Sequence, residues 1–401
     1  MSGLTPVTVD GVDVSAGVTA ARGFRAAGIP AGIKGGGKPD LALVVNDGPN
    51  VDAAGVFTRN VVKAAPVLWS KQVLTERRLR AVVLNSGSAN AATGPPGFQD
   101  AHATAEKAAA VLGTGAIEIA VCSTGLIGER LPMQAVLPGI DTCAASLSAS
   151  PSAATDAATA VLTTDSRPKQ AAVTHADGWS IGGFAKGAGM LAPNMATMLS
   201  VITTDAVLGG EALDTVLRAA SRVTFDRLDV DGGTSTNDTV LLLSSGASGI
   251  VPSVEEFTNL LSDMSLSLVR QLQADSEGAT KLVDITVRGA PSETDAIQVG
   301  RTVAEDNLVK TALFGSDPNW GRIAMAVGRS QFAADPDRLG ITVNGVELMR
   351  DGLASRDRSE ADLSGARVEI TIDLGAGTDQ ATIYSTDLSH GYVEENSAYS
   401  S

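Results

Sequence analysis

Short apolar runs alternate with helix-like stretches along the chain, and this order is the strongest constraint on its fold. Strand-like runs lie at 41–45, 81–85, 117–122, 199–204, 240–245, 282–289, 323–328, 367–374 and 381–388. Helical patterns lie between them, at 98–113, 150–163, 254–278 and 300–315. The longest has apolar residues at i, i+3 and i+4 with Ser253 as a candidate N-cap, and Gly113 is a plausible C-cap of the first. We therefore predict a mixed α/β fold.

The composition favours a globular protein that packs through small side chains. Aromatic residues make up 3% of the 401 residues, whereas glycine occurs 43 times. A chain of this length can form two domains or one large α/β unit. No apolar run approaches the roughly 20 residues that span a bilayer, and the first residues lack the basic and apolar regions of a signal peptide. We expect a cytoplasmic protein that does not bind a membrane.

The charge and the few metal-binding residues argue against several functions. A formal net charge of −15 argues against nucleic acid and anionic membrane surfaces, because phosphate binding needs clustered Lys and Arg. Two cysteines, Cys122 and Cys143, cannot form a disulfide scaffold in so long a chain. The three histidines, His102, His175 and His390, lack the spacing of zinc ligands. An enzyme that acts on small molecules fits these limits.

One segment, residues 182–206, interrupts the regular pattern. It begins with four glycines in eight positions and continues through Pro193-Asn194 into a β-rich run. Because Gly and Pro disfavour regular structure, we expect an irregular loop at its beginning. A chain that must hold one peptide bond in a geometry open to nucleophilic attack would contain such a segment. An ordinary glycine-rich loop would have the same composition.

The motif GIKGGGKP at 32–39 nearly matches a phosphate-binding loop. Pro39 stands where such a loop needs a Ser or Thr hydroxyl for magnesium, and proline lacks the N–H that would start the phosphate-binding helix. No strongly apolar strand directly precedes Gly32. We interpret the motif as a flexible loop.

A second motif, NSGSAN at 85–90, resembles the nucleophile elbow of a serine hydrolase. It lacks the second glycine of G-x-S-x-G. A Ser-His-Asp site would also have to recruit a histidine without any supporting motif. A serine hydrolase is therefore disfavoured.

Ala196-Thr197 offers a third possibility, an N-terminal nucleophile made by internal cleavage. A threonine hydroxyl is a weak nucleophile that needs an adjacent base. Cleavage before Thr197 would free an α-amine with a pKa of about 7.7–8.0, which accepts a proton near neutral pH. A lysine, such as the upstream Lys186, would first need its pKa lowered from about 10.4. The dipeptide alone is too common to decide between this reading and an ordinary loop.

The segment KGAGMLAPNMATML at 186–199 resembles the self-processing signature of the ornithine acetyltransferase family, also called glutamate N-acetyltransferase. Other blocks agree in order along almost the whole chain. They are GFRAAGIPAGIK (23–34), GVFTRN (55–60), NSGSANAATG (85–94), STGLIGERLPM (123–133), TTDSRPK (163–169), DVDGGTSTNDT (229–239), DSEGATK (275–281), FGSDPNWGRI (314–323) and ENSAYSS (395–401). One block would carry little weight, but the ordered set makes the resemblance strong.

The resemblance implies a catalytic machinery by matching position. Thr197 matches the nucleophile, which attacks the Ala196 carbonyl in the precursor and accepts the acetyl group in the mature enzyme. Thr124 and Gly125 match the oxyanion-hole pair. Acyl transfer needs such donors at the developing negative charge, and one of them is typically worth about 3–4 kcal/mol.

The same matching assigns the substrate-binding residues. The matching positions are Thr163, Lys186, Thr197, Glu277, Asn396 and Ser401. Lys186 and Glu277 also match catalytic positions: Glu277 would pair with a substrate ammonium or move a proton, and Lys186 would meet a carboxylate. The residues expected to hold turns beside the site are Asp231, Asn237 and Asp238.

By this resemblance the fold would be α/β, with layered sheets sandwiched by helices and the chain cut into two associated fragments. Residues 1–196 would carry the oxyanion hole and the cleavage loop. Residues 197–401 would carry the nucleophile and a C-terminal substrate-binding tail. Two processed protomers would pair as an α2β2 heterotetramer.

The implied reaction is ping-pong transfer of an acetyl group from N-acetylornithine to glutamate in arginine biosynthesis. No metal or redox cofactor is implied. Some family members also use acetyl-CoA as a donor and others do not, and no residue decides this for the present chain. Two alternatives stay open: a self-processed amidase or aminopeptidase, in which water accepts the acyl group, and a non-catalytic binding protein that keeps the fold.

Overall fold

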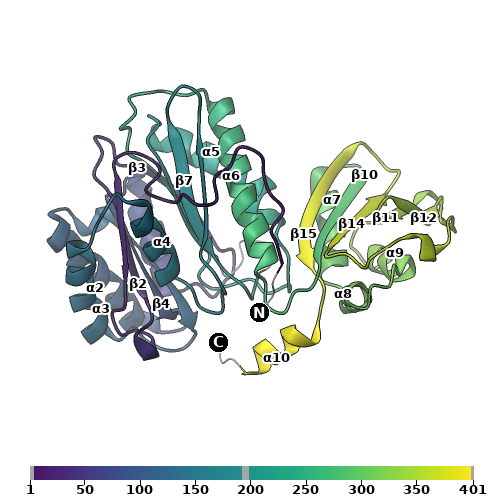
Figure 1. Ribbon diagram of the computed structural model, residues 1–401, viewed down its shortest axis with the longest axis horizontal. Helices are drawn as coiled ribbons and strands as arrows, with labels where there is room; N and C mark the ends of the chain where they lie inside the picture. The colour runs from purple at the N-terminus through teal and green to yellow at the C-terminus, as the bar shows by residue number, and fades with distance from the viewer. Residues whose placement is uncertain (1–3, 192–197, 399–401) are drawn as a thin grey trace.

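The computed structural model describes residues 4–191 and 198–398, which fold into two lobes (Figure 1). The first lobe contains a five-stranded and a four-stranded sheet. In spatial order, the five-stranded sheet consists of β3 (Asp52–Phe57), β9 (Thr239–Ser244), β8 (Leu199–Thr204), β7 (Ser180–Lys186) and β6 (Lys169–Thr174). The four-stranded sheet consists of β1 (Phe24–Ile29), β2 (Leu41–Asn46), β4 (Ala81–Ser88) and β5 (Ile119–Leu126). Neighbouring strands are antiparallel except in the parallel pairs β8–β9 and β4–β5.

Helices pack on both sheets of the first lobe. Those in contact with the four-stranded sheet are α1 (Ala65–Val73), α2 (Gly94–Leu112), α3 (Met133–Ala145) and α4 (Pro151–Ala160), and those in contact with the five-stranded sheet include α5 (Gly210–Val223) and α6 (Val254–Ala274). The two-residue period of a strand explains this layering. Val201 and Leu241 enter the core shared with the four-stranded sheet, whereas their neighbours Ile202 and Leu242 enter the core under α5 and α6. The layered α/β architecture predicted from the sequence is confirmed.

The second lobe is built on a six-stranded sheet. Its spatial order is β13 (Leu353–Ala354), β12 (Val346–Arg350), β11 (Gly340–Val343), β14 (Arg367–Asp373), β10 (Leu282–Ala290) and β15 (Asp379–Thr386). The helices α7 (Glu293–Ala304), α8 (Asn307–Phe314) and α9 (Trp320–Gly328) follow one another, with α7 against β10 and β15 and α9 against β11. After β15, α10 (His390–Ala398) leads the chain back toward the first lobe (Figure 1).

The two helix caps predicted from the sequence are confirmed. The Ser253 hydroxyl accepts the N–H of Glu256 at 3.1 Å, and the Glu256 carboxylate accepts the N–H of Ser253, which makes a capping box at the start of α6. Gly113 ends α2 with φ 69°, and its N–H donates to the carbonyl oxygen of Ala109. Local sequence signals therefore determine one end of each of these two long helices.

Two predicted elements differ from the structure. The strand predicted at 323–328 is wrong, because Asn319 caps a helix there and the buried residues of α9 follow helical spacing. The helix predicted at 300–315 is two helices. The Asp306 carboxylate accepts backbone N–H groups at the start of α8, so the chain ends α7 and begins again in a new direction.

The prediction that the glycine-rich segment begins as an irregular loop is also wrong, because β7 runs through it to Lys186. Its glycines serve close packing. A Cβ atom at Gly182 would lie 2.2 Å from the carbonyl oxygen of Gly17, and one at Gly183 would lie 2.9 Å from that of Val201. Residues 192–197 of this segment lie outside the described residues.

We predict that Gly28→Ala destabilises the first lobe. A Cβ atom at Gly28 would lie 2.0 Å from the carbonyl oxygen of Asp156 in α4, so β1 and α4 would have to separate. Overpacking of this kind costs about 1–3 kcal/mol, which chemical denaturation measures as a lower free energy of unfolding. Gly35→Ala is the control, because no atom lies within 4 Å of its Cβ position. Equal stability of the two variants would contradict the packing argument.

Candidate active site

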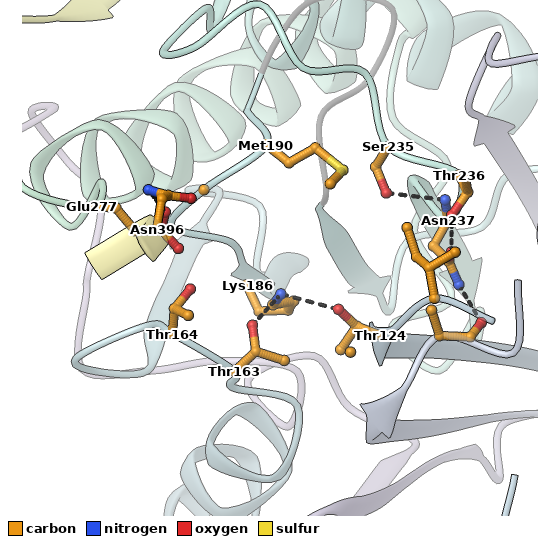
Figure 2. A pocket seen from close by; sticks show the side chains of 14 residues that line it. Thr124, Thr163, Thr164, Lys186, Met190, Ser235, Thr236, Asn237, Glu277 and Asn396 are labelled. Carbon is orange, nitrogen blue, oxygen red and sulfur yellow. Dashed lines mark hydrogen bonds between the residues drawn. The ribbon is translucent and has the colours of Figure 1, made fainter. Parts of the chain in front are cut away.

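A cavity of about 630 Å³, including its solvent-open mouth, lies where the ends of β5 and β7 meet α10. The predicted site residues that line it are Thr124, Gly125, Thr163, Lys186, Glu277 and Asn396 (Figure 2). The other three predicted residues, Ala196, Thr197 and Ser401, lie outside the described residues. The structure thus brings together every predicted site residue that it describes.

One wall of the cavity comes from the close approach of the parallel strands β4 and β5. Gly87 and Gly125 pair across these strands, and Gly125 has φ 130°. A Cβ atom at Gly125 would lie 2.4 Å from the carbonyl carbon of Gly87, so only glycine fits. Thr124, 1% exposed, precedes it. The backbone of Gly125 and the side chain of Thr124 therefore lie next to each other at this wall.

Lys186, the last residue of β7, points its ammonium into the cavity floor (Figure 2). Its Nζ donates to Oγ1 of Thr163 at 2.9 Å and to Oγ1 of Thr124 at 3.1 Å, and the residue is 1% exposed. Burial lowers the pKa of Lys186, and the carboxylate of Asp165 is the main group that opposes this shift. The site therefore holds a partly compensated buried cation beside two hydroxyls.

The opposite wall carries a carboxylate. Glu277 follows the end of α6, its N–H donates to the carbonyl oxygen of Ala188, and its Oε2 accepts a hydrogen bond from Nδ2 of Asn396 at 2.8 Å. Its carboxylate lies against Gly189, where a Cβ atom would come within 2.2 Å of Oε2. The cavity thus places an acceptor for a cation opposite the Lys186 ammonium.

Two aspartates, the part-buried Asp231 and the buried Asp238, hold the chain on each side of residues 192–197. Asp231 accepts the N–H groups of Met190 at 2.7 Å and Leu191 at 2.9 Å, and Asp238 accepts the N–H of Met198 at 3.1 Å. Burial raises the pKa of both carboxyl groups, and these backbone hydrogen bonds oppose that rise. Both aspartates fix backbone beside the site, which is the structural role expected of them.

Sequence reasoning missed other residues of the cavity lining. These are Ala89, Ile127, Thr164, Gly189, Met190, Ser235 and Thr236, and Asn237 was expected only to hold a turn. All of them lie inside the sequence blocks that carry the family resemblance, so the blocks were the available signal. The amide of Asn237 donates to the carbonyl oxygens of Ala89 and Ser123, at 2.7 and 2.8 Å, and so joins β5 to this lining.

The two competing motifs do not form sites of their own. Residues Gly35–Gly37 make a short exposed 3-10 turn that leads into a strand, without the helix that a phosphate loop requires. The hydroxyls of Ser86 and Ser88 donate to the carbonyl oxygens of Ala160 and Glu129. Within residues 4–191 and 198–398, no group of three or more His, Cys, Asp or Glu side chains is placed to hold a metal ion.

Comparison with known proteins places the chain in a family. The family model of the ArgJ family matches residues 25–401. The chain belongs to the ArgJ family. A protein of Mycolicibacterium paratuberculosis named "Arginine biosynthesis bifunctional protein ArgJ" is 60% identical to it over 390 residues, 96% of each chain. A protein of Streptomyces coelicolor with the same name is 58% identical over 384 residues, 96% of this chain and 100% of its own.

A solved structure is also similar in sequence to this ArgJ-family chain. It is ornithine acetyltransferase complexed with ornithine, from Mycobacterium tuberculosis. Its sequence identity to this chain is 60% and the TM-score is 0.45; the match covers 45% of this chain and 97% of the solved chain. The resemblance inferred from the ordered sequence blocks is confirmed by the family match, and so is the prediction that the chain is an enzyme. The roles of individual residues stay predictions.

We predict that Gly278→Ala loosens α10. Gly278 has φ 62°, and a Cβ atom there would lie 2.0 Å from the backbone nitrogen of Tyr392. Hydrogen–deuterium exchange should therefore become faster across 390–398. Gly249→Ala is the matched control, because Gly249 has φ 72° and no atom within 4 Å of its Cβ position. Unchanged exchange of α10 in Gly278→Ala would show that this contact does not hold the helix.

Proposed function

We propose that the chain transfers the acetyl group of N2-acetyl-L-ornithine to L-glutamate in arginine biosynthesis, giving L-ornithine and N-acetyl-L-glutamate. The observation that carries this proposal is the convergence of Thr124, Lys186 and Glu277 on one cavity. The names of the relatives, which place them in arginine biosynthesis at 60% and 58% identity, support the pathway.

The proposed maturation step makes the nucleophile and its base together. The Thr197 hydroxyl attacks the Ala196 carbonyl carbon, the peptide C–N bond breaks, and the Thr197 amine is freed while an ester forms at its oxygen. Water then hydrolyses the ester, which leaves a carboxyl group on Ala196 and restores the Thr197 hydroxyl. The products are the fragments 1–196 and 197–401. Hydrogen bonds from Met190 and Leu191 to Asp231, and from Met198 to Asp238, hold the flanking backbone for this step.

The proposed transfer uses the same hydroxyl twice. The Thr197 amine accepts the hydroxyl proton while the oxygen attacks the acetyl carbonyl of acetylornithine, and Thr124 and Gly125 stabilise the oxyanion. The C–N bond to ornithine breaks, and the departing amine takes the proton. The glutamate amine then attacks the acetyl ester, and N-acetylglutamate leaves as the Thr197 hydroxyl is restored.

The charges of the cavity suit these two amino acids. Both carry an α-carboxylate, for which the buried Lys186 ammonium is a charge-assisted donor. The side-chain ammonium of acetylornithine is a suitable partner for the Glu277 carboxylate, which Asn396 orients from α10. In this proposal Thr163 completes the lining beside Lys186, and Ser401 contributes from the C-terminus.

Several finer points stay predictions. The proposed reaction requires no bound cofactor, because the acetyl group moves between two amines through Thr197. The α2β2 assembly and a cytoplasmic location are part of the same proposal, and acetyl-CoA is a second candidate donor. In the described part of the chain, no helix has the length and apolar character needed to cross a membrane.

We predict that the purified protein consists of two fragments, the second beginning with Thr197. Intact-mass analysis and N-terminal sequencing measure this directly. Thr197→Ala should abolish both cleavage and acetyl transfer, because it removes the hydroxyl, whereas Thr197→Ser should keep part of each. One uncut chain of 40.7 kDa after long incubation would refute self-processing. Substantial transfer by Thr197→Ala would refute Thr197 as the nucleophile.

We predict that release of ornithine from acetylornithine depends on glutamate. In a transferase the acetyl ester reacts with an amine, so it turns over slowly when only water is present. In an amidase the acceptor of the acyl group is water itself. Ornithine release is measured with and without glutamate, and N-acetylglutamate is measured in the same samples. Equal rates of steady-state ornithine release in both samples would favour the self-processed amidase over the transferase.

A further inference from the structure

We propose that Asp165 is a positioning residue for Lys186: it holds the ammonium between Thr124 and Thr163 and keeps it charged. This inference rests on the proposed function, because it assigns a task to Lys186 in substrate binding. Asp165 does not line the cavity itself. It acts through its neighbour.

The contacts of Asp165 reach both segments that meet at the Lys186 ammonium. Its Oδ2 lies 3.8 Å from Nζ of Lys186 and accepts the N–H of Thr163 at 3.1 Å. Its Oδ1 accepts the N–H of Gly187, the residue after Lys186, at 2.6 Å. One carboxylate therefore holds the backbone of both Thr163 and Gly187 while it faces the Lys186 ammonium. This keeps Lys186 and Thr163, which are joined by a hydrogen bond, close to each other.

A buried chain of alternating charges extends from Asp165 away from the cavity. Nζ of Lys169 lies 2.6 Å from Oδ1 of Asp165 and 2.6 Å from Oδ2 of Asp275, and all three side chains are 0% exposed. Asp275 ends α6, two residues before Glu277, and accepts hydrogen bonds from the N–H and the hydroxyl of Ser166. These buried ion pairs thus connect the segment that contains Thr163 with the segment that contains Glu277.

The electrostatic effect of Asp165 has a definite sign. Burial lowers the pKa of Lys186, and among the groups that raise it again Asp165 is the strongest. Burial alone would raise the pKa of Asp165, but the Lys169 and Lys186 ammonium groups bring it below its usual value. The charged groups that face Lys186 are Asp165, Lys169, Glu277, Asp238 and Lys34. Removing the Asp165 charge therefore lowers the pKa of Lys186 further, so the ammonium is lost at a lower pH.

The decisive comparison is Asp165→Asn against Asp275→Asn. Both variants remove one buried carboxylate from Lys169 and leave the same net charge in the buried chain, but only Asp165 faces Lys186. Each cut enzyme is assayed with acetylornithine and glutamate across pH. In Asp165→Asn, kcat/KM should fall about tenfold to a hundredfold, as for loss of a hydrogen bond to a charged group. The alkaline limb of the profile, the fall in kcat/KM at high pH as Lys186 loses its proton, should move to lower pH. In Asp275→Asn the limb should stay where the wild type has it.

Lys169→Met should shift the alkaline limb in the opposite direction. It also tests the proposal if Asp165→Asn does not yield folded, cut enzyme. It removes a cation that lowers the pKa of Lys186, so the alkaline limb should move to higher pH. An alkaline limb that Asp165→Asn leaves unchanged, or that moves as far in Asp275→Asn, would overturn the role of Asp165; so would a limb that Lys169→Met fails to raise. Absence of acetyl transfer by the wild-type enzyme would instead refute the proposed function.

Discussion

The buried ammonium of Lys186 is the interaction on which the candidate site depends. It stands at the end of β7 in one sheet and donates to Thr124 on β5 of the other sheet and to Thr163 beyond α4. Burying an unpaired ammonium costs several kcal/mol even after the protein relaxes. The surrounding chain must therefore supply a carboxylate and hydroxyl acceptors at fixed positions. Meeting that requirement fixes the ends of two sheets and one loop relative to each other, and the cavity is the space between them.

The second lobe contributes to this cavity through α10, which returns from β15 (Figure 1). A helix so near the chain terminus ordinarily frays. Here the Ser389 hydroxyl donates to the carbonyl oxygen of Gly278, and the close approach at Gly278 brings Tyr392 against the residue after Glu277. Burial, together with Asp231, raises the pKa of Tyr392 to about 12, so its hydroxyl stays protonated beside that carboxyl group. Asp231 therefore links the backbone at Met190 to α10, and the two lobes share one wall of the site.

The sequence predicted most strands of the first lobe because their apolar runs are long and end at turn residues. It failed at 323–328, since a short apolar run fits a strand as well as a helix and only the cap at Asn319 decides between them. It misread Gly182, because the atom that requires a glycine there belongs to Gly17, far away in the sequence. The residues of the site were found through family blocks rather than through local chemistry. The pairing of Lys169 with Asp275 could not be predicted, because no local pattern joins residues more than a hundred positions apart.

The carboxyl groups of Asp231 and Asp238, on either side of residues 192–197, are costly to remove from water and yet hold the backbone there. Burial raises the pKa of Asp231 and Asp238, so ionising either carboxyl group costs more there than it does in water. A neutral side chain would avoid that cost, yet an asparagine offers one acceptor oxygen where an aspartate offers two. Asp231 uses both of its oxygens, one for Met190 and one for Leu191. The backbone on both sides of residues 192–197 is thereby tied to the body of the first lobe, at Met190 and Leu191 before that segment and at Met198 after it.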